Sequence, residues 1–287
     1  MTKKFSVYLQ YLLPQHLLTL FIGWLAECRW AWVKNIFITQ IMRAYHIDLS
    51  TARIENPQDY PNFNSFFTRQ LKPELRPIVK NPLHLLSPVD GCAVQATRIK
   101  KNQLLQAKNM YFTVETLLGG EQSIAHSFYD GSYAIFYLAP ADYHRVHMPI
   151  TGRLTKSIFI PGKLFSVNRM TSDIIPNLYA RNERLVACFD TAAGPMAVIM
   201  VGALIVASIQ AVWRKAFRSK TISQEIYPAT GKQLIQLEQG DELGQFKMGS
   251  TVILLFGKEA DLTWSMQLNT AVKMGQVLGT VVNTPSP

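Results

Sequence analysis

The sequence contains few cysteines, and they are widely separated. Cys28, Cys92 and Cys188 form neither a CxxC pair nor the dense framework of a disulfide-rich domain, which favours a reducing compartment. The six histidines include one close pair, His144 and His147, but no HExxH motif and no Cys/His grouping with the spacing of zinc ligands. We therefore expect no metal site.

Acidic residues are also scarce, since 29 Lys and Arg stand against 19 Asp and Glu and give a formal net charge of +10. Such an excess favours a polyanionic partner, either a nucleic acid or an anionic membrane surface. The basic residues are scattered among Leu, Phe, Tyr and Trp rather than gathered in the tracts typical of nucleic-acid-binding arms. We therefore expect an anionic phospholipid surface as the partner and no nucleic acid.

The stretch from Phe5 to Ala26 lacks any charged residue, so a signal peptide or a transmembrane helix has to be considered. Pro14-Gln15-His16 divides it into halves that are each too short to cross a bilayer. A lipoprotein signal needs a small residue where Glu27 stands. We expect neither a membrane span nor secretion.

We expect residues 1–55 to form an amphipathic helical appendage that binds a membrane. Its two short apolar helices are followed by CRWAWVKNIFITQIMRAY, in which Trp30 and Trp32 stand beside Arg29 and Lys34. Aromatic rings at the boundary and cations near lipid phosphate are typical of helices that lie among lipid headgroups. The alternative is a helical hairpin packed on the protein's own core.

Short apolar runs separated by turns indicate a β-rich core from Leu85 onward. The runs are LLSPVDG, GSYAIFYLAP, LTKSIFIPG, LVACFD, MAVIMVGALIVASI and STVILLF. The apolar stretch from Ala197 to Trp213 is interrupted by glycine and polar residues, and it predicts two buried strands rather than a membrane span. The expected fold class is α+β, with a β-rich domain over residues 56–287.

A proline-rich segment links the helical appendage to this core. Within it, NFNSFFTRQL predicts one short helix that begins at Asn62 or Asn64 and ends at Leu71.

Several polar residues follow the apolar strand AIFYL in the segment LAPADYHRVHMP. If this segment is extended, the side chains of Asp142 and His144 share one face, whereas those of Tyr143, Arg145 and His147 share the other. Two histidines on opposite faces would suit separate roles. The alternative is a polar loop with one structural histidine.

An acid, a base and a hydroxyl are available in Asp90, His147 and Ser250. The SPVDG turn around Asp90 is either a plain turn or the holder of a carboxylate that orients a histidine. The local sequence of Ser250 is KMGST, which lacks the Gly-x-Ser-x-Gly elbow of serine hydrolases. An activated Ser250 hydroxyl can instead attack the carbonyl of Gly249, where glycine offers the least steric resistance. Elimination from the resulting ester cuts the chain and leaves dehydroalanine, which hydrolyses to a pyruvoyl group.

Two other interpretations stay open from these residues alone. One is a triad hydrolase that uses Ser250 directly, and the other is a membrane-docked binding module in which KMGST is only the entrance of a strand. Both predict an intact chain, whereas self-cleavage predicts a break between Gly249 and Ser250.

Taken together, DYHRVHMP, PGKLFSVN, NLYARNER, SPVDG and FKMGSTVILLF resemble the bacterial membrane-associated phosphatidylserine decarboxylases over nearly the whole chain, including the opening LQYLLPQHLLTLFIGWLAE. Members commonly have Leu-Gly-Ser-Thr where this chain has Met248 in the first place. The resemblance implies cleavage between Gly249 and Ser250, with Ser250 converted to a pyruvoyl cofactor and with no metal or external cofactor.

The resemblance also implies a role for each site residue. Asp90 and His147 match a charge relay for self-processing, His144 matches a histidine of the decarboxylation step, and Asp142 is expected to help in processing. Phosphatidylserine would form a Schiff base with the pyruvoyl group and lose its carboxylate, and His144 would protonate the former Cα to yield phosphatidylethanolamine.

The same resemblance sets expectations about assembly and location. The catalytic domain would be residues 56–287, and its two chains would stay associated after cleavage, with a homodimer left open. The protein would be peripheral to the cell membrane on its cytoplasmic face.

Overall fold

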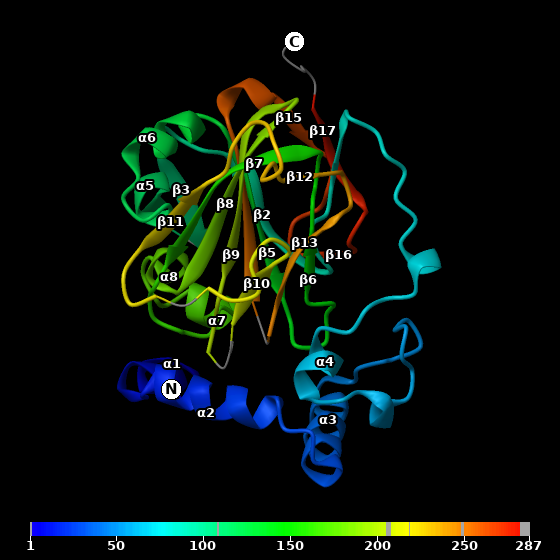
Figure 1. The fold of residues 1–287 in the computed structure, drawn as a ribbon. Helices are drawn as coiled ribbons and strands as arrows, with labels where there is room; N and C mark the ends of the chain where they lie inside the picture. The colour runs from blue at the N-terminus through cyan, green and yellow to red at the C-terminus, as the bar shows by residue number, and fades with distance from the viewer. Residues whose placement is uncertain (1, 108, 205–207, 218, 248–249, 282–287) are drawn as a thin grey trace.

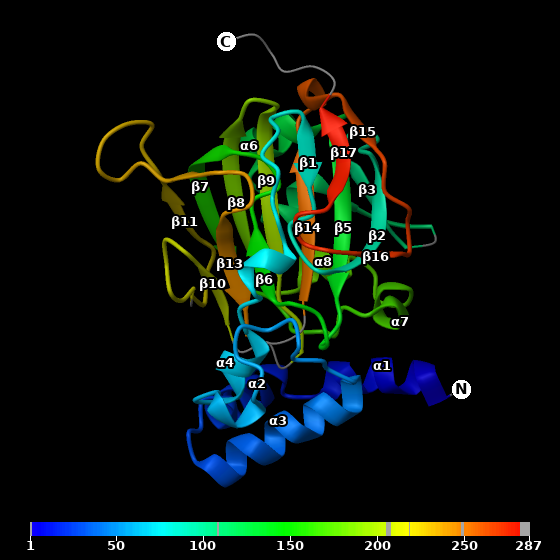
Figure 2. The same ribbon diagram turned by 90° about the vertical axis from the view of Figure 1, so that its right-hand side faces the viewer.

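The computed structural model describes residues 2–107, 109–204, 208–217, 219–247 and 250–281. Three amino-terminal helices lie together at one end of a sheet-rich body, and both views show the long strands rising away from them (Figures 1 and 2). These helices are α1 (Thr2–Leu12), α2 (Gln15–Ala26) and α3 (Ala31–Tyr45). The α+β class with a β-rich core is confirmed.

The predicted break at Pro14 separates α1 from α2. Proline lacks the amide hydrogen that a continuing helix would need, but it is tolerated just before a new helix starts. Within the described ranges, no helix combines the length and the apolar content that a bilayer crossing needs.

The main sheet has nine strands in the part of the chain that the structure describes, in the order β11-β7-β8-β9-β14-β5-β2-β16, with β12 paired to β7. All of these pairs are antiparallel. The strands are β2 (Gly91–Arg98), β5 (Ser132–Leu138), β7 (Gly152–Ile160), β8 (Arg184–Thr191), β9 (Gly194–Val201), β11 (Ser223–Ile226), β12 (Gln236–Leu237), β14 (Ser250–Phe256) and β16 (Ala271–Val272).

Strand β14 lies at the centre of this sheet, between β5 and β9, and all seven of its residues are buried. This agrees with the prediction that STVILLF belongs to the β-rich core, because a run of β-branched and apolar residues fits a strand covered on both faces. The stretch Ala197–Trp213 contains most of β9 and the short β10 (Ile209–Ala211), so the prediction of two strands is confirmed, although residues 205–207 lie outside the description.

Smaller elements surround the main sheet. Three-stranded sheets have the orders β10-β13-β6 and β1-β17-β15, and β3 pairs with β4. Their strands are β1 (His84–Leu86), β3 (Gln103–Ala107), β4 (Met110–Thr113), β6 (Arg145–His147), β13 (Glu242–Phe246), β15 (Leu262–Trp264) and β17 (Val277–Val281). The short helices are α4 (Phe63–Phe67), α5 (Val114–Leu117), α6 (Gln122–Ala125), α7 (Arg169–Ser172) and α8 (Leu178–Arg181), with 3₁₀ turns at Pro57–Asp59, Pro73–Leu75, His126–Phe128 and Lys258–Ala260.

Helix α4 is shorter than the sequence predicts. Its start is as expected, because the Oδ1 atom of Asn62 accepts a hydrogen bond from the amide of Ser65 at 2.8 Å. The helix ends at Phe67 rather than at Leu71 because residues 70–72 pair with residues 51–53. That pairing is tertiary, so helix propensity does not predict it.

A second apolar cluster joins the amino-terminal helices to α4. Its buried members are Ala26, Ile38, Ile47, Leu49, Ala52, Tyr60, Phe63, Phe66 and Phe67. The rings of Phe37 on α3 and Phe63 on α4 lie 4.3 Å apart. Helix α4 therefore lies between α3 and the strand ends of the body, as Figure 2 shows.

Candidate functional site

The predicted site residues gather where the central strands end beside α4. Ser250, the first residue of β14, pairs with Leu138, the last residue of β5. On the other side of β5, Cys92 pairs with Tyr137, so Asp90 lies just beyond the same edge. Gly91 permits this approach, because a Cβ atom there would lie 2.5 Å from the carbonyl oxygen of Tyr137.

A tight turn brings His144 to this edge. The amide of Asp142 donates to the carbonyl of Ala139 at 2.9 Å, and the amide of Ala139 donates to the Oδ2 atom of Asp142 at 2.8 Å. Asp142 thus uses its carboxylate to close the turn. Burial raises the pKa of this carboxyl group, and the nearby charge of Asp90 acts in the same direction. Beyond the turn, the carbonyl of His144 accepts from the amide of Phe246 at 3.0 Å, on the strand that leads toward Ser250.

The His144 side chain has no exposed surface, and its ring centroid lies 4.1 Å from that of Phe67 on α4. Its Nδ1 atom lies 2.8 Å from the carbonyl oxygen of Asp142. Because a carbonyl only accepts, Nδ1 carries the hydrogen and Nε2 keeps a lone pair. Burial lowers the pKa of His144 to about 3, so the ring is neutral near pH 7.

Among the described residues, the buried Oγ atom of Ser250 and the buried Nε2 atom of His144 have no hydrogen-bond partner. Leaving a buried polar group unpaired costs about 1–3 kcal/mol. Such groups are rare in folded proteins and often have a functional role. Gly249, which is predicted to precede the cleaved bond, lies outside the described residues.

His147 is fixed from three sides. Its amide donates to the carbonyl of Pro88 in the SPVDG turn at 2.8 Å. The ring Nδ1–H donates to the carbonyl of Gly240 at 2.8 Å, and the hydroxyl of Tyr143 donates to Nε2 at 3.0 Å. The expected shared face of Tyr143 and His147 is confirmed by this bond. Burial lowers the pKa of His147, so the ring is neutral near pH 7 and its Nε2 atom carries a lone pair.

The Asp90 carboxylate is 4 % exposed and accepts three hydrogen bonds. The donors are the amide of Met274 at 2.7 Å, Nη2 of Arg76 at 2.8 Å and Nζ of Lys273 at 3.4 Å. Neither ring hydrogen bond of His147 goes to Asp90. The SPVDG turn nevertheless holds the two residues close, since the charge of Asp90 contributes to opposing the fall in the pKa of His147.

The amino-terminal helices are tied directly to this edge through Glu27 at the end of α2. Its carboxylate accepts from the side-chain amides of Asn62 at 2.8 Å and Asn64 at 2.9 Å. It also accepts from Nζ of Lys247 at 2.6 Å, three residues before Ser250. Glu27, which stands where a lipoprotein signal needs a small residue, thus connects α2, α4 and the segment that leads into β14.

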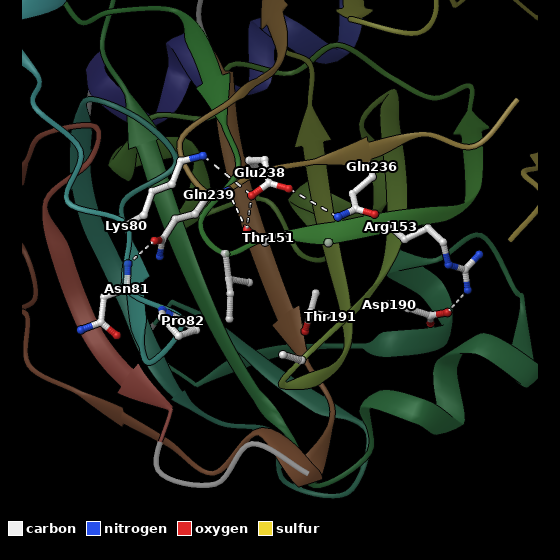
Figure 3. Close-up of a pocket in the computed structure, with 13 residues that line it drawn as sticks. Lys80, Asn81, Pro82, Thr151, Arg153, Asp190, Thr191, Gln236, Glu238 and Gln239 are labelled. Atoms are coloured by element: carbon white, nitrogen blue, oxygen red, sulfur yellow. Dashed lines mark hydrogen bonds and ion pairs between the residues drawn. The ribbon is translucent and has the colours of Figure 1, made fainter. Parts of the chain in front are cut away.

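A cavity of about 570 Å³ lies elsewhere. The strand register places it at the ends of β7 and β8 that are remote from Ser250. Figure 3 shows its polar lining, in which Lys80 pairs with Glu238 at 3.8 Å and Arg153 pairs with Asp190. Its charges are matched, and none of the predicted site residues lines it.

Two smaller cavities adjoin the site residues. The first, about 360 Å³, is lined by His147 and Tyr143 together with the basic residues Arg53, Lys72 and Arg76. The second, about 340 Å³, also reaches Arg53 and is lined by residues of α4 and β6. No group of three or more His, Cys, Asp and Glu residues in the described part of the chain is arranged to hold a metal ion.

Known proteins resemble this chain over nearly its whole length. The family model described as phosphatidylserine decarboxylase matches residues 63–280, and a second one, described as PSD, matches residues 5–46. The phosphatidylserine decarboxylase proenzyme of Idiomarina loihiensis is 44% identical over 284 residues, which cover 98% of this chain and 97% of the relative. The proenzyme of Azotobacter vinelandii is 47% identical over 274 residues, covering 94% and 96%. That of Stutzerimonas stutzeri is 45% identical over 283 residues, covering 97% and 95%. With matches that span both the helices and the sheets, the chain belongs to the phosphatidylserine decarboxylase family.

Proposed function

We propose that this protein decarboxylates phosphatidylserine to phosphatidylethanolamine, after self-cleavage between Gly249 and Ser250. The observation that carries this proposal is the buried, unpaired hydroxyl of Ser250 at the first position of the central strand, next to the turn that bears the unpaired Nε2 atom of His144. A hydroxyl kept without a partner in such a place is free to react.

The site fits a pyruvoyl group made from Ser250. Its Oγ atom is engaged in no hydrogen bond that cleavage would have to break. Once formed, the group supplies a ketone that takes up the substrate amine and accepts the electron pair released with carbon dioxide. This chemistry would need no external cofactor, because the group that accepts the electron pair would be part of the chain.

His147 is the base we assign to self-processing. Its Nδ1–H is held by the carbonyl of Gly240, so the Nε2 lone pair is the basic atom. A change in the Tyr143 hydroxyl bond would free that lone pair to take the Ser250 proton. The Asp90 carboxylate then stabilises the imidazolium through its charge. Asp142 helps indirectly, since it closes the turn that carries the site.

His144 is the group we assign to turnover. Its Nε2 atom, which has no partner among the described residues, is the atom that would carry the proton released when the substrate ammonium condenses with the ketone. The same nitrogen then returns that proton to the former Cα after carbon dioxide leaves. Phe67 packs against the ring, and the buried environment keeps water from supplying the proton instead.

The two chains produced by cleavage are expected to stay together. Strand β14 pairs along its length with β5 on one side and β9 on the other, both of which belong to the longer chain. Further along, β16 pairs with β2, and β17 pairs with β1. A homodimer remains a prediction from the resemblance.

Residues 1–55 are the segment we propose to dock on the cytoplasmic face of the membrane, with residues 56–287 as the catalytic domain. Leu12 is 81% exposed and Trp24 is 70% exposed. The other large apolar side chains exposed on α1–α3 and their connections include Leu17, Leu20, Phe21, Trp30, Trp32 and Ile36. An apolar surface on neighbouring helices is typical of segments that lie among lipid headgroups.

The intact mass of the purified protein tests the proposed function. We expect two chains, Met1–Gly249 and a chain starting at position 250 that is lighter by one ammonia than the serine-started peptide. That mass difference is the signature of a pyruvoyl group. A protein that converts phosphatidylserine as a single full-length chain would refute self-cleavage.

Replacing Trp24 and Trp30 together by glutamate should weaken membrane binding by more than tenfold. Each indole buries up to about 250 Å² on insertion, and apolar burial is worth about 25 cal/mol per Å². Co-sedimentation with vesicles that contain phosphatidylserine measures the effect. The matched control is Tyr111→Glu, which changes an exposed aromatic on β4, away from these helices. Equal loss in both proteins would point to a general charge effect rather than to docking.

A further inference from the structure

Arg69, just after α4, is a buried cation with unused donors. The residue as a whole is 5 % exposed. One nitrogen, Nη2, donates to the carbonyl of Ala141 at 2.7 Å, whereas Nε and Nη1 have no hydrogen-bond partner in the described part of the chain. Burial lowers the pKa of Arg69, opposed most by Tyr60 and Asp142, but a guanidinium starts so far above neutrality that it stays charged. A bound anion would compensate this buried positive charge and would accept hydrogen bonds from the two unpaired nitrogens.

The cavity beside Arg69 has the composition of an anion site. Its volume is about 340 Å³, and its lining includes Arg53, Arg69 and Arg145 but no Asp or Glu among the described residues. Arg145 is itself paired with Glu242 at 2.7 Å, so Arg69 is the cation left to meet a ligand.

We propose that this cavity binds the phosphodiester group of the phospholipid headgroup, with Arg69 as its main contact and Arg53 at its rim. The fork of a guanidinium presents parallel N–H groups that match two oxygens of a phosphate or a phosphodiester. The inference deepens the proposed function, because only that function identifies the anion as part of phosphatidylserine.

The position of the cavity fits this role. Arg69 follows Phe67, which packs on His144, by two residues, and Arg145 follows His144 directly. The Nε atom of Arg145 donates to the carbonyl of Thr68 at 2.9 Å, which holds the two segments together. In phosphatidylserine the amine is on the second carbon from the phosphate ester oxygen. A phosphate subsite must therefore lie close to the reactive group, and Arg145, which lines this cavity, is the residue next to His144 in the chain.

Arg76 is a poorer candidate for the same task. Its Nη2 atom is paired with Asp90 at 2.8 Å, and Lys273 shares that carboxylate. A phosphate bound there would compete with a buried carboxylate, whereas at Arg69 it would meet donors that are already free.

Binding of soluble anions to the Ser250→Ala proenzyme tests the proposal without turnover. Calorimetric titration with glycerophosphoserine should give saturable binding, and adding Arg69→Met should weaken it by about tenfold or more. Arg69→Lys, which keeps the charge but loses the fork, should fall between the two. Arg153→Met is the matched control, since Arg153 pairs with Asp190 at the remote cavity, and it should leave the affinity unchanged.

Titration with inorganic phosphate separates the two sources of this chemistry. Tighter binding of glycerophosphoserine supports a headgroup site, whereas equal affinities would overturn the lipid assignment and leave a free-phosphate site. Unchanged glycerophosphoserine binding in Arg69→Met would overturn the site itself. If Arg69→Met fails to fold in a thermal melt, Arg53→Met at the exposed rim takes its place, with a smaller expected loss.

Kinetics of the processed enzyme distinguish this inference from the proposed function. Arg69→Met should raise KM for phosphatidylserine about tenfold or more while kcat changes little, because the contact is made before and during the reaction alike. If the wild-type protein does not convert phosphatidylserine, the proposed function is wrong. The anion titration would still show whether the cavity beside Arg69 binds an anion.

Discussion

Ser250→Ala is expected to leave the chain uncut and to abolish conversion of phosphatidylserine. In the proposed mechanism the hydroxyl of Ser250 is both the nucleophile of self-cleavage and the source of the pyruvoyl group, so no other atom replaces it. Its removal breaks no hydrogen bond to any described residue, because the Oγ atom has no partner among them, and a methyl group fits a strand that is buried throughout. The variant should therefore fold with little change in the free energy of unfolding. Intact mass and release of carbon dioxide are the two measurements.

Thr251→Val is the matched control for this prediction. The Oγ1 atom of Thr251 is likewise buried and without a partner, and valine keeps the shape of the side chain. This variant removes an equivalent hydroxyl one residue further along β14 and should still be cut and active. Turnover by Ser250→Ala would refute the mechanism, whereas loss of cutting in both variants would indicate a packing effect on the strand.

Local signals in the sequence predicted the elements that frame the site. The apolar run after Ser250 predicts a buried strand, Pro14 predicts the break between two helices, and Asn62 predicts the start of α4. Each of these follows from the chemistry of a few neighbouring residues. The structure agrees with all three.

Contacts between segments that are far apart in the sequence could not be predicted from such local signals. Asp90 was expected to orient His147, but its carboxylate accepts from Arg76 and Lys273 instead, and the His147 ring is held by Gly240, 93 residues away. A backbone carbonyl is available at every residue, so no pattern in the sequence marks the one that will be used.

Arg69 was missed for a related reason. In NFNSFFTRQL an arginine near the end of a short amphipathic helix is normally exposed. The pairing of residues 70–72 with residues 51–53 ends the helix early and draws the preceding residue inward. Its burial is a product of tertiary pairing, and only the structure reveals its unused donors.

His144→Ala should still be cut but should lose turnover. In the proposed mechanism processing draws on His147, whose ring is held at Gly240 and Tyr143, whereas His144 lies in a separate, fully buried position with an Nε2 atom that has no partner among the described residues. Removing a general acid–base group typically lowers kcat by about 10²–10⁴-fold. Cutting is read from the intact mass, and turnover from carbon dioxide released per processed chain.

Two further variants make this separation of roles decisive. His144→Asn keeps a donor that can reach the Asp142 carbonyl but removes the Nε2 lone pair, so it should be cut and inactive like His144→Ala, with less disturbance of the turn. His147→Ala should behave in the opposite way and stay uncut. If both His144 variants remain uncut while folding normally, one histidine serves processing as well as turnover, and the division that their separate environments support is wrong.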